Sequence, residues 1–133
     1  MKISEDQMNR EKLELEFEVR SSPSVLFNYL STPSGLVEWF CDDVNLKGKD
    51  KYIFIWEGEE RIATLIRKVS GKYIKWRWDD EDEAEFFEFS IRKDELTGDI
   101  ALIITDFVDE DEVEEMELLW ESQVQDLRNA LGV

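Results

Sequence analysis

Apolar and charged residues alternate strictly where the patterned part of the chain begins. Apolar side chains occupy every second position from Leu13 to Val19, and charged side chains stand between them. Because successive side chains of a β-strand point to opposite faces of the sheet, this pattern predicts a strand with one buried and one solvated face. Residues 1–9 are polar and aperiodic, so we expect a flexible tail before a single domain over residues 10–133.

Two short helices are predicted directly after this strand. Ser22-Pro23 and Thr32-Pro33 each place an N-cap residue before a proline at the first helical position, where the missing N–H of proline costs nothing. Apolar residues follow both starts at helical spacing. These residues are Val25, Leu26, Tyr29, Leu30, Leu36, Trp39 and Phe40.

The middle of the chain has the pattern of a meander of β-strands. Short apolar segments rich in β-branched and aromatic residues are separated by glycine-containing connections, which favours antiparallel pairing between neighbours. The predicted strands cover residues 44–46, 52–56, 61–69, 73–78, 86–92 and 100–107. With the first strand, the sequence predicts a seven-stranded antiparallel sheet.

The period of the apolar residues changes in the last segment. Val113, Met116, Trp120, Val124, Leu127 and Leu131 recur every three or four residues. This stripe predicts one long helix of about five turns. Asp111 and Glu114 resemble a capping box at its start, and Gly132 suits its end.

Charge narrows the range of partners. The chain has 33 acidic and 16 basic residues, a formal net charge of −17. Such a charge repels phosphate backbones and anionic membrane surfaces, so we expect neither nucleic acid nor membrane as a partner. We interpret the acidic surface as a solubility coat and expect a monomer or a weak dimer.

Cysteine usage and the first residues predict a cytoplasmic protein. The single cysteine, Cys41, cannot close an internal disulfide, and the first residues lack the apolar stretch of a signal peptide. No apolar run reaches the ~20 residues that a membrane-spanning helix needs.

Several kinds of site are excluded or disfavoured. The absence of histidine excludes His-based triads and nearly all zinc or iron sites. The acidic runs 79–83 and 109–112 match no calcium-loop spacing and suit a solvated loop and a helix start, so we expect no metal and no cofactor. Cys41 stands beside Asp42 and Asp43, which favours a buried structural thiol over a nucleophile.

Aromatic and other large apolar side chains are the most informative candidates for a site. On the predicted strands they share one face, and the apolar stripe of the last helix would lie against that face. They are Trp56, Trp76, Trp78, Phe87, Phe89, Met116, Trp120 and Val124. Two arrangements are open: these side chains interlock as a filled core, or they enclose a pocket for a flat apolar ligand.

Local strings resemble those of a known family. The segment Ser22–Phe27 (SPSVLF), then Leu30–Leu36 (LSTPSGL) and Trp39-Phe40, resembles the opening motif of the homologues of the heat-shock-protein ATPase activator. The segment Ile103–Phe107 (IITDF) before the long helix resembles the closing half of that family. The order of elements resembles the START/Bet v1-like superfamily, which implies an α+β helix-grip fold: the sheet wraps around the long C-terminal helix.

The resemblance alone does not choose a function. From the converging aromatic side chains we expect a START-like domain that binds a small hydrophobic or aromatic ligand between the sheet and the C-terminal helix, without catalysing a reaction. Two alternatives stay open. One is a protein-interaction module of the co-chaperone type, linked to the stress response. The other is a cyclase- or dehydratase-like enzyme, which would need a carboxyl or phenol group in the cavity. Its candidates are Tyr29, Tyr52, Tyr73 and Asp106.

Overall fold

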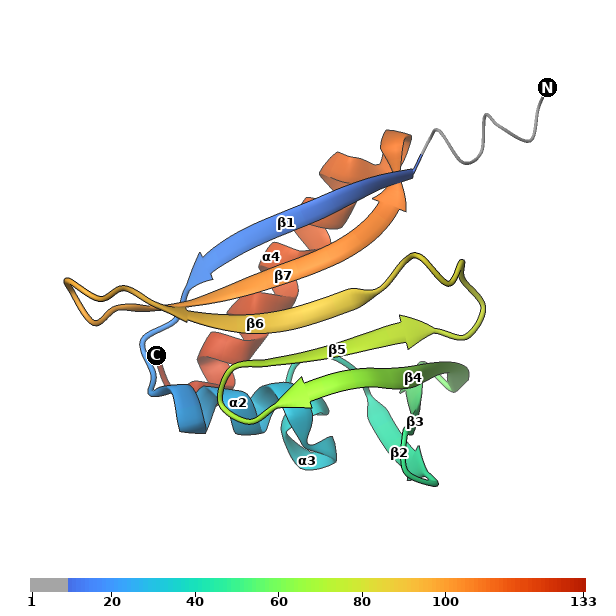
Figure 1. Cartoon of the computed structure of the whole chain (residues 1–133), viewed down its shortest axis with the longest axis horizontal. Helices are drawn as coiled ribbons and strands as arrows, with labels where there is room; N and C mark the ends of the chain where they lie inside the picture. The colour runs from blue at the N-terminus through green and yellow to red at the C-terminus, as the bar shows by residue number, and fades with distance from the viewer. Residues whose placement is uncertain (1–9) are drawn as a thin grey trace.

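The computed structural model describes residues 10–133, and its centre is a seven-stranded antiparallel sheet in the order β1-β7-β6-β5-β4-β3-β2 (Figure 1). The strands are β1 (Arg10–Glu18), β2 (Asp43–Lys47), β3 (Lys51–Trp56), β4 (Glu59–Val69), β5 (Tyr73–Trp78), β6 (Phe87–Lys93) and β7 (Ile100–Asp109). The helices are α2 (Pro23–Ser31), α3 (Pro33–Leu36), the 3-10 turn η1 (Glu110–Glu112) and α4 (Val113–Leu131). The predicted tail over residues 1–9 lies outside the described residues.

The predicted α+β helix-grip fold is confirmed. Two short helices follow the first strand, and α4 runs across one face of the antiparallel sheet (Figure 1). β5 covers residues 73–78 as predicted, and the predicted strand at 61–69 is Glu59–Val69. In β4 the register shifts between Leu65 and Arg67, so one residue bulges out of the pairing with β5.

The second short helix ends earlier than its apolar spacing predicts. α3 stops at Leu36, whereas the pattern extended to Phe40. The carbonyl of Leu36 accepts the N–H groups of Trp39, Phe40 and Cys41 at 3.3, 2.8 and 3.2 Å. The chain therefore forms a turn in which three N–H groups share one carbonyl, and the regular helical hydrogen bonds do not continue. Trp39 and Phe40, which lie in this turn, are buried in the core.

The start of α4 differs from the prediction and its end agrees with it. The predicted capping box of Asp111 and Glu114 is wrong: Asp111 lies within η1, and the N-cap is Glu112, whose side chain accepts no capping hydrogen bond. At the other end Gly132 adopts the left-handed conformation with φ of 78°, and its N–H bonds to the carbonyl of Asn129 at 3.1 Å. Glycine suits this position because a side chain would be strained there.

Helix α4 is anchored to the sheet mainly through its second half. Trp120, Val124 and Leu127 are buried against the sheet, while Met116 near the start of the helix is only half-buried. The guanidinium of Arg128 donates to the carbonyl of Glu18 at 2.7 and 3.1 Å, which fixes the end of the helix to β1. The first turns of α4 therefore leave room above the sheet.

Within residues 10–133, none of the helices has both the length and the apolar character that a membrane crossing requires.

Candidate ligand pocket

A cavity of about 320 Å³ lies between the first half of α4 and the inner face of the sheet. Residues from β3, β4, β5, β6, β7 and α4 line it, together with one residue of the turn that follows α3. The lining residues are Phe40, Trp56, Arg61, Trp78, Phe87, Asp106, Met116, Leu119, Trp120 and Gln123. We call this cavity the aromatic pocket.

The side chains proposed from the sequence fall into two groups. Trp56, Trp78, Phe87, Met116 and Trp120 line the aromatic pocket. Their role in ligand binding stays a prediction, but the structure brings them to one place.

Trp76, Phe89 and Val124 do not line the pocket. Each is fully buried, with no exposed surface, in the core beneath it. Trp76 stacks on Phe87 with ring centroids 5.0 Å apart, and Phe89 meets the edge of Trp120 at 5.9 Å. The two arrangements left open by the sequence therefore both occur, a filled core at one level of the sheet and a cavity at the next.

The pocket walls hold one another in place. Phe40 lies parallel to Trp120 with centroids 5.9 Å apart, and Phe87 stacks on Trp78 at 4.6 Å. The indole N–H of Trp56 donates to the carbonyl of Phe40 at 2.8 Å. Because each ring is fixed by a neighbouring ring or a hydrogen bond, the walls of the cavity are preorganised.

Asp106 supplies a carboxyl group to this apolar surface. Its Oδ2 accepts a hydrogen bond from Nε1 of Trp120 at 3.2 Å, and its Oδ1 accepts one from the backbone N–H of Phe107 at 2.9 Å. Burial raises the pKa of Asp106 to about 6, against the lowering effect of these two hydrogen bonds. Asp106 therefore changes its charge close to neutral pH.

Arg61 brings the only basic side chain among the lining residues. Its guanidinium lies over the ring of Trp78, 4.0 Å from the centroid, in a cation–π contact. It donates two hydrogen bonds to Asp80, at 3.1 and 2.9 Å, and one to Glu81 at 2.8 Å. The charge of Arg61 is therefore paired with carboxylates at the pocket rim.

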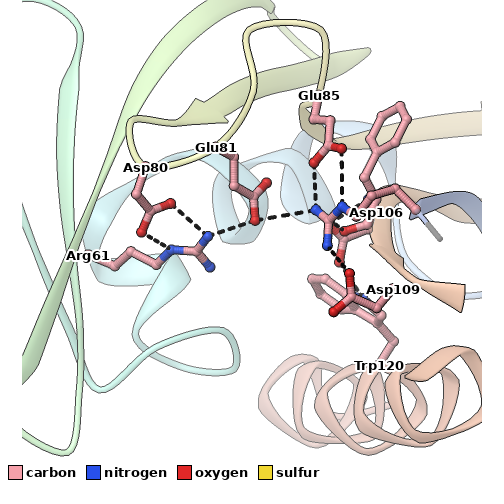
Figure 2. A network of polar contacts seen from close by, with 9 residues as sticks. Arg61, Asp80, Glu81, Glu85, Asp106, Asp109 and Trp120 are labelled. Atoms are coloured by element: carbon pink, nitrogen blue, oxygen red, sulfur yellow. Dashed lines mark hydrogen bonds and ion pairs between the residues drawn. The ribbon is translucent and has the colours of Figure 1, made fainter. Parts of the chain in front are cut away.

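Glu81 extends this pairing into a network that reaches β1 (Figure 2). Arg10 lies 3.6 Å from Glu81, and it donates to Glu85 at 2.5 and 3.1 Å and to Asp109 at 3.0 Å. The acidic run at 79–83 is therefore more than the solvated loop we expected, because part of it binds arginine side chains. In the described residues no cluster of acidic or cysteine side chains has the arrangement of a metal site.

Sequence reasoning missed Phe40, Arg61, Leu119 and Gln123 as lining residues. Phe40 had a usable signal, its place in the apolar pattern after Pro33. The other three are polar or lie beside the main stripe of α4, so no periodicity marks them.

The candidates for an enzymatic role separate in the structure. Asp106 lines the aromatic pocket, whereas Tyr29, Tyr52 and Tyr73 do not. Tyr52 is buried in the core, its hydroxyl lies 3.5 Å from the carbonyl of Ser31, and burial raises its pKa.

Cys41 is a buried free thiol, as its sequence context predicted. Burial first, and then the charges of Asp43 and Asp42, raise its pKa to about 12. The thiolate, which is the reactive form, is therefore disfavoured.

Comparisons with known proteins agree with this architecture. A protein of Bacteroides fragilis, BfR322, has a solution structure that is 38% identical over 93% of each chain, with a TM-score of 0.65. The solution structure of the Aha1 dimer from Colwellia psychrerythraea is 17% identical over 91% of this chain and 96% of that chain, with a TM-score of 0.75. DynU16, a protein of the dynemicin biosynthetic locus, has a TM-score of 0.74 at 12% identity, over 92% of this chain and 47% of that chain.

No curated protein matches the sequence. Residues 7–133 match the START-like superfamily domain, which covers nearly the whole chain and all the elements described above. The predicted superfamily is thereby confirmed, and the chain belongs to the START-like superfamily.

Proposed function

We propose that this domain binds a small hydrophobic or aromatic molecule in the aromatic pocket and catalyses no reaction. The observation that carries the proposal is the pocket itself: about 320 Å³ of space with five aromatic side chains among its lining residues. Ligand sites of this kind are concave and mostly apolar, with a few polar groups that fix orientation. Asp106, Arg61 and Gln123 are the polar groups here.

We propose that this binding takes place in the cytoplasm. The single cysteine is an unpaired buried thiol, which a reducing compartment preserves.

Native mass spectrometry of the protein purified from its own host tests whether a ligand is carried. We expect a mass above that of the polypeptide under gentle ionisation, and the polypeptide mass alone after denaturation. Titration of the purified protein with 2-naphthylmethanol, a flat neutral probe, tests the capacity of the pocket independently of what the host supplies. Absence of both the added mass and probe binding would overturn the proposal.

Two substitutions in α4 separate binding from stability. Trp120→Ala removes a pocket wall, whereas Val124→Ala removes a core side chain one turn later that does not line the pocket. We expect both to destabilise the domain, Trp120→Ala by ~3 to 5 kcal/mol. Calorimetric titration at a temperature where both variants are folded should show weakened probe binding for Trp120→Ala only.

A second candidate function is a protein-interaction module. Leu118 and Leu119 are 66% and 48% exposed on α4, and Leu119 also lines the aromatic pocket. Large apolar side chains that stay exposed on a helix can form part of a contact surface. Pull-down from host lysate with the wild type and with a Leu118→Ser variant would detect such a partner, and an unchanged set of captured proteins would count against it.

A further inference from the structure

The residues that line the aromatic pocket favour a bound group with a positive charge. Phe40, Trp56, Trp78, Phe87 and Trp120 contribute aromatic rings, and Asp106 contributes a carboxyl group. Aromatic faces are electrostatically negative, and sites that enclose ammonium groups are built from such rings. A carboxylate beside them adds a full negative charge in a partly desolvated place, where charge-assisted hydrogen bonds are strong.

One cationic side chain of the protein, that of Arg61, already packs on an aromatic ring of the pocket. The guanidinium of Arg61 lies 4.0 Å from the centroid of the Trp78 ring. The ring of Trp78 therefore stabilises a positive charge in the folded protein.

Asp106 has hydrogen-bonding capacity left for a ligand. A carboxylate has about four lone-pair positions, and the structure gives it one donor at each oxygen, Trp120 and Phe107. The remaining lone pairs can accept only from a group that carries N–H or O–H.

An anionic ligand is disfavoured even though Arg61 lines the pocket. The guanidinium is held by the carboxylates of Asp80 and Glu81, so its charge is compensated. The net charge of −17 adds long-range repulsion of anions and attraction of cations.

We propose that the aromatic pocket selects organic cations: compact apolar molecules that carry one ammonium group, with the ammonium against the carboxylate of Asp106 and the apolar part between the rings. This inference rests on the proposed function and adds the chemical class of the ligand.

Three probes of matched shape test the charge preference. 2-Naphthylmethylammonium, 2-naphthylmethanol and 2-naphthoate are titrated into the protein by calorimetry at pH 7.5 and ~150 mM salt, where exposed charges are screened within ~8 Å. The indole N–H signal of Trp120 is followed by NMR, because this group contacts Asp106 and lines the pocket. We expect the ammonium to bind at least tenfold more tightly than the alcohol, and the carboxylate most weakly.

A pair of variants with equal charge change assigns the preference to Asp106. Asp106→Asn removes the pocket carboxylate and keeps an oxygen that can accept from Trp120. Asp126→Asn removes an exposed carboxylate on α4 that does not line the pocket. We expect the preference for the ammonium to fall to threefold or less in Asp106→Asn and to be retained in Asp126→Asn, with the affinity for the alcohol similar in both.

The pH dependence gives an independent readout. Charged groups that act on Asp106 are Arg10 from β1 and Glu81 from the β5–β6 connection, and Arg61 from β4 lines the same cavity. From α4 the side chains of Met116, Leu119, Trp120 and Gln123 line the cavity, and none of them titrates. Alkylammonium groups stay protonated below pH ~9. Asp106, whose pKa is raised to about 6, loses its negative charge as the pH falls from 7.5 to 5. We therefore expect the affinity for the ammonium to fall several-fold over this range, while the affinity for the alcohol stays constant.

The outcomes separate this inference from the proposed function. Binding of none of the three probes would overturn both. Binding of the alcohol as tightly as the ammonium would overturn the cation preference alone and leave the apolar pocket standing. A preference that survives in Asp106→Asn, or is lost equally in Asp126→Asn, would show that Asp106 does not provide it.

Discussion

Asp106 is an acidic residue in a largely buried, mostly apolar environment. It stands on β7 between Thr105 and Phe107, in a strand that is otherwise mostly apolar, and it faces the indole of Trp120 from α4. The carboxyl group is kept there by two hydrogen bonds, but burial still disfavours its charged form. This conflict has a measurable effect on stability.

The pH dependence of stability should differ between the wild type and Asp106→Asn. The pKa of Asp106 is raised to about 6 in the folded protein from an ordinary value of 3.8, so ionising it costs stability as the pH rises through this range. Below pH ~3 the group is protonated in both the folded and unfolded states, and the cost vanishes. We expect Asp106→Asn to be more stable than the wild type by about 3 kcal/mol at pH 7.5 and equal to it at pH 3.

Urea unfolding at several pH values measures this difference. Comparing the two proteins at each pH cancels the titration of the other acidic residues. Asp126→Asn is the control, because its exposed carboxylate should show no such gain at pH 7.5. A wild type that is more stable than Asp106→Asn at pH 7.5 would contradict the assignment.

At the scale of elements, the pair α2 and α3 depends on a close backbone contact. Gly35 is buried, and a Cβ built on it would lie 2.3 Å from the carbonyl oxygen of Asn28 and 2.6 Å from Cα of Tyr29. No side chain can occupy that space without moving the backbone of α2. Trp39 depends on the same arrangement, since its indole N–H donates to the carbonyl of Tyr29 at 2.8 Å.

Gly35→Ala should therefore destabilise the domain, even though alanine is the better helix former. We expect a loss of about 2 kcal/mol from the forced displacement of the two helices. Ser34→Ala, at the exposed neighbouring position, is the matched control and should cost less than about 0.5 kcal/mol. Thermal unfolding followed by tryptophan fluorescence reports both effects, and equal stability of the two variants would rule out the close contact.

On the scale of the whole molecule, Arg10 joins parts of the chain that are far apart in sequence. It binds Glu85 in the β5–β6 connection and Asp109 at the end of β7, and through Glu81 it reaches the rim of the aromatic pocket. Figure 2 shows Glu81 and Glu85 on one side of this network and Asp109 on the other. The network therefore links β1, β7, the β5–β6 connection and β4 at the end of the sheet where the pocket lies.

Arg10→Ala should loosen this end of the molecule. Hydrogen bonds to charged groups contribute ~1.5 to 3 kcal/mol, and partial exposure reduces this, so we expect a loss of about 1 to 2 kcal/mol. Hydrogen exchange should become faster at the amides of residues 79–86 and stay unchanged in α2. Arg67→Ala, which removes an exposed arginine of β4, is the control, and equal exchange in both variants would contradict the role of Arg10.

The aromatic pocket shows where prediction from the sequence stopped. Alternation on β5 correctly placed Trp76 and Trp78 on the same inner face of the sheet. It did not distinguish their environments: Trp76 is buried in the packed core, whereas Trp78 lines the cavity. The difference depends on how far α4 stands from the sheet at each level, and periodicity along one strand contains no information on that distance.

By itself, the sequence determined the elements and the fold class. Strand alternation, the two N-cap and proline pairs and the apolar stripe of the last helix are local signals, because they reflect backbone preferences and the need to bury one face. Tertiary structure alone decided which residues meet. Arg61 lies over Trp78, and Asp106 meets Trp120, because strands and a helix distant in the chain pack against each other. The pocket and its charge arise from these tertiary contacts, because the contacts depend on distances between elements that no local sequence pattern encodes.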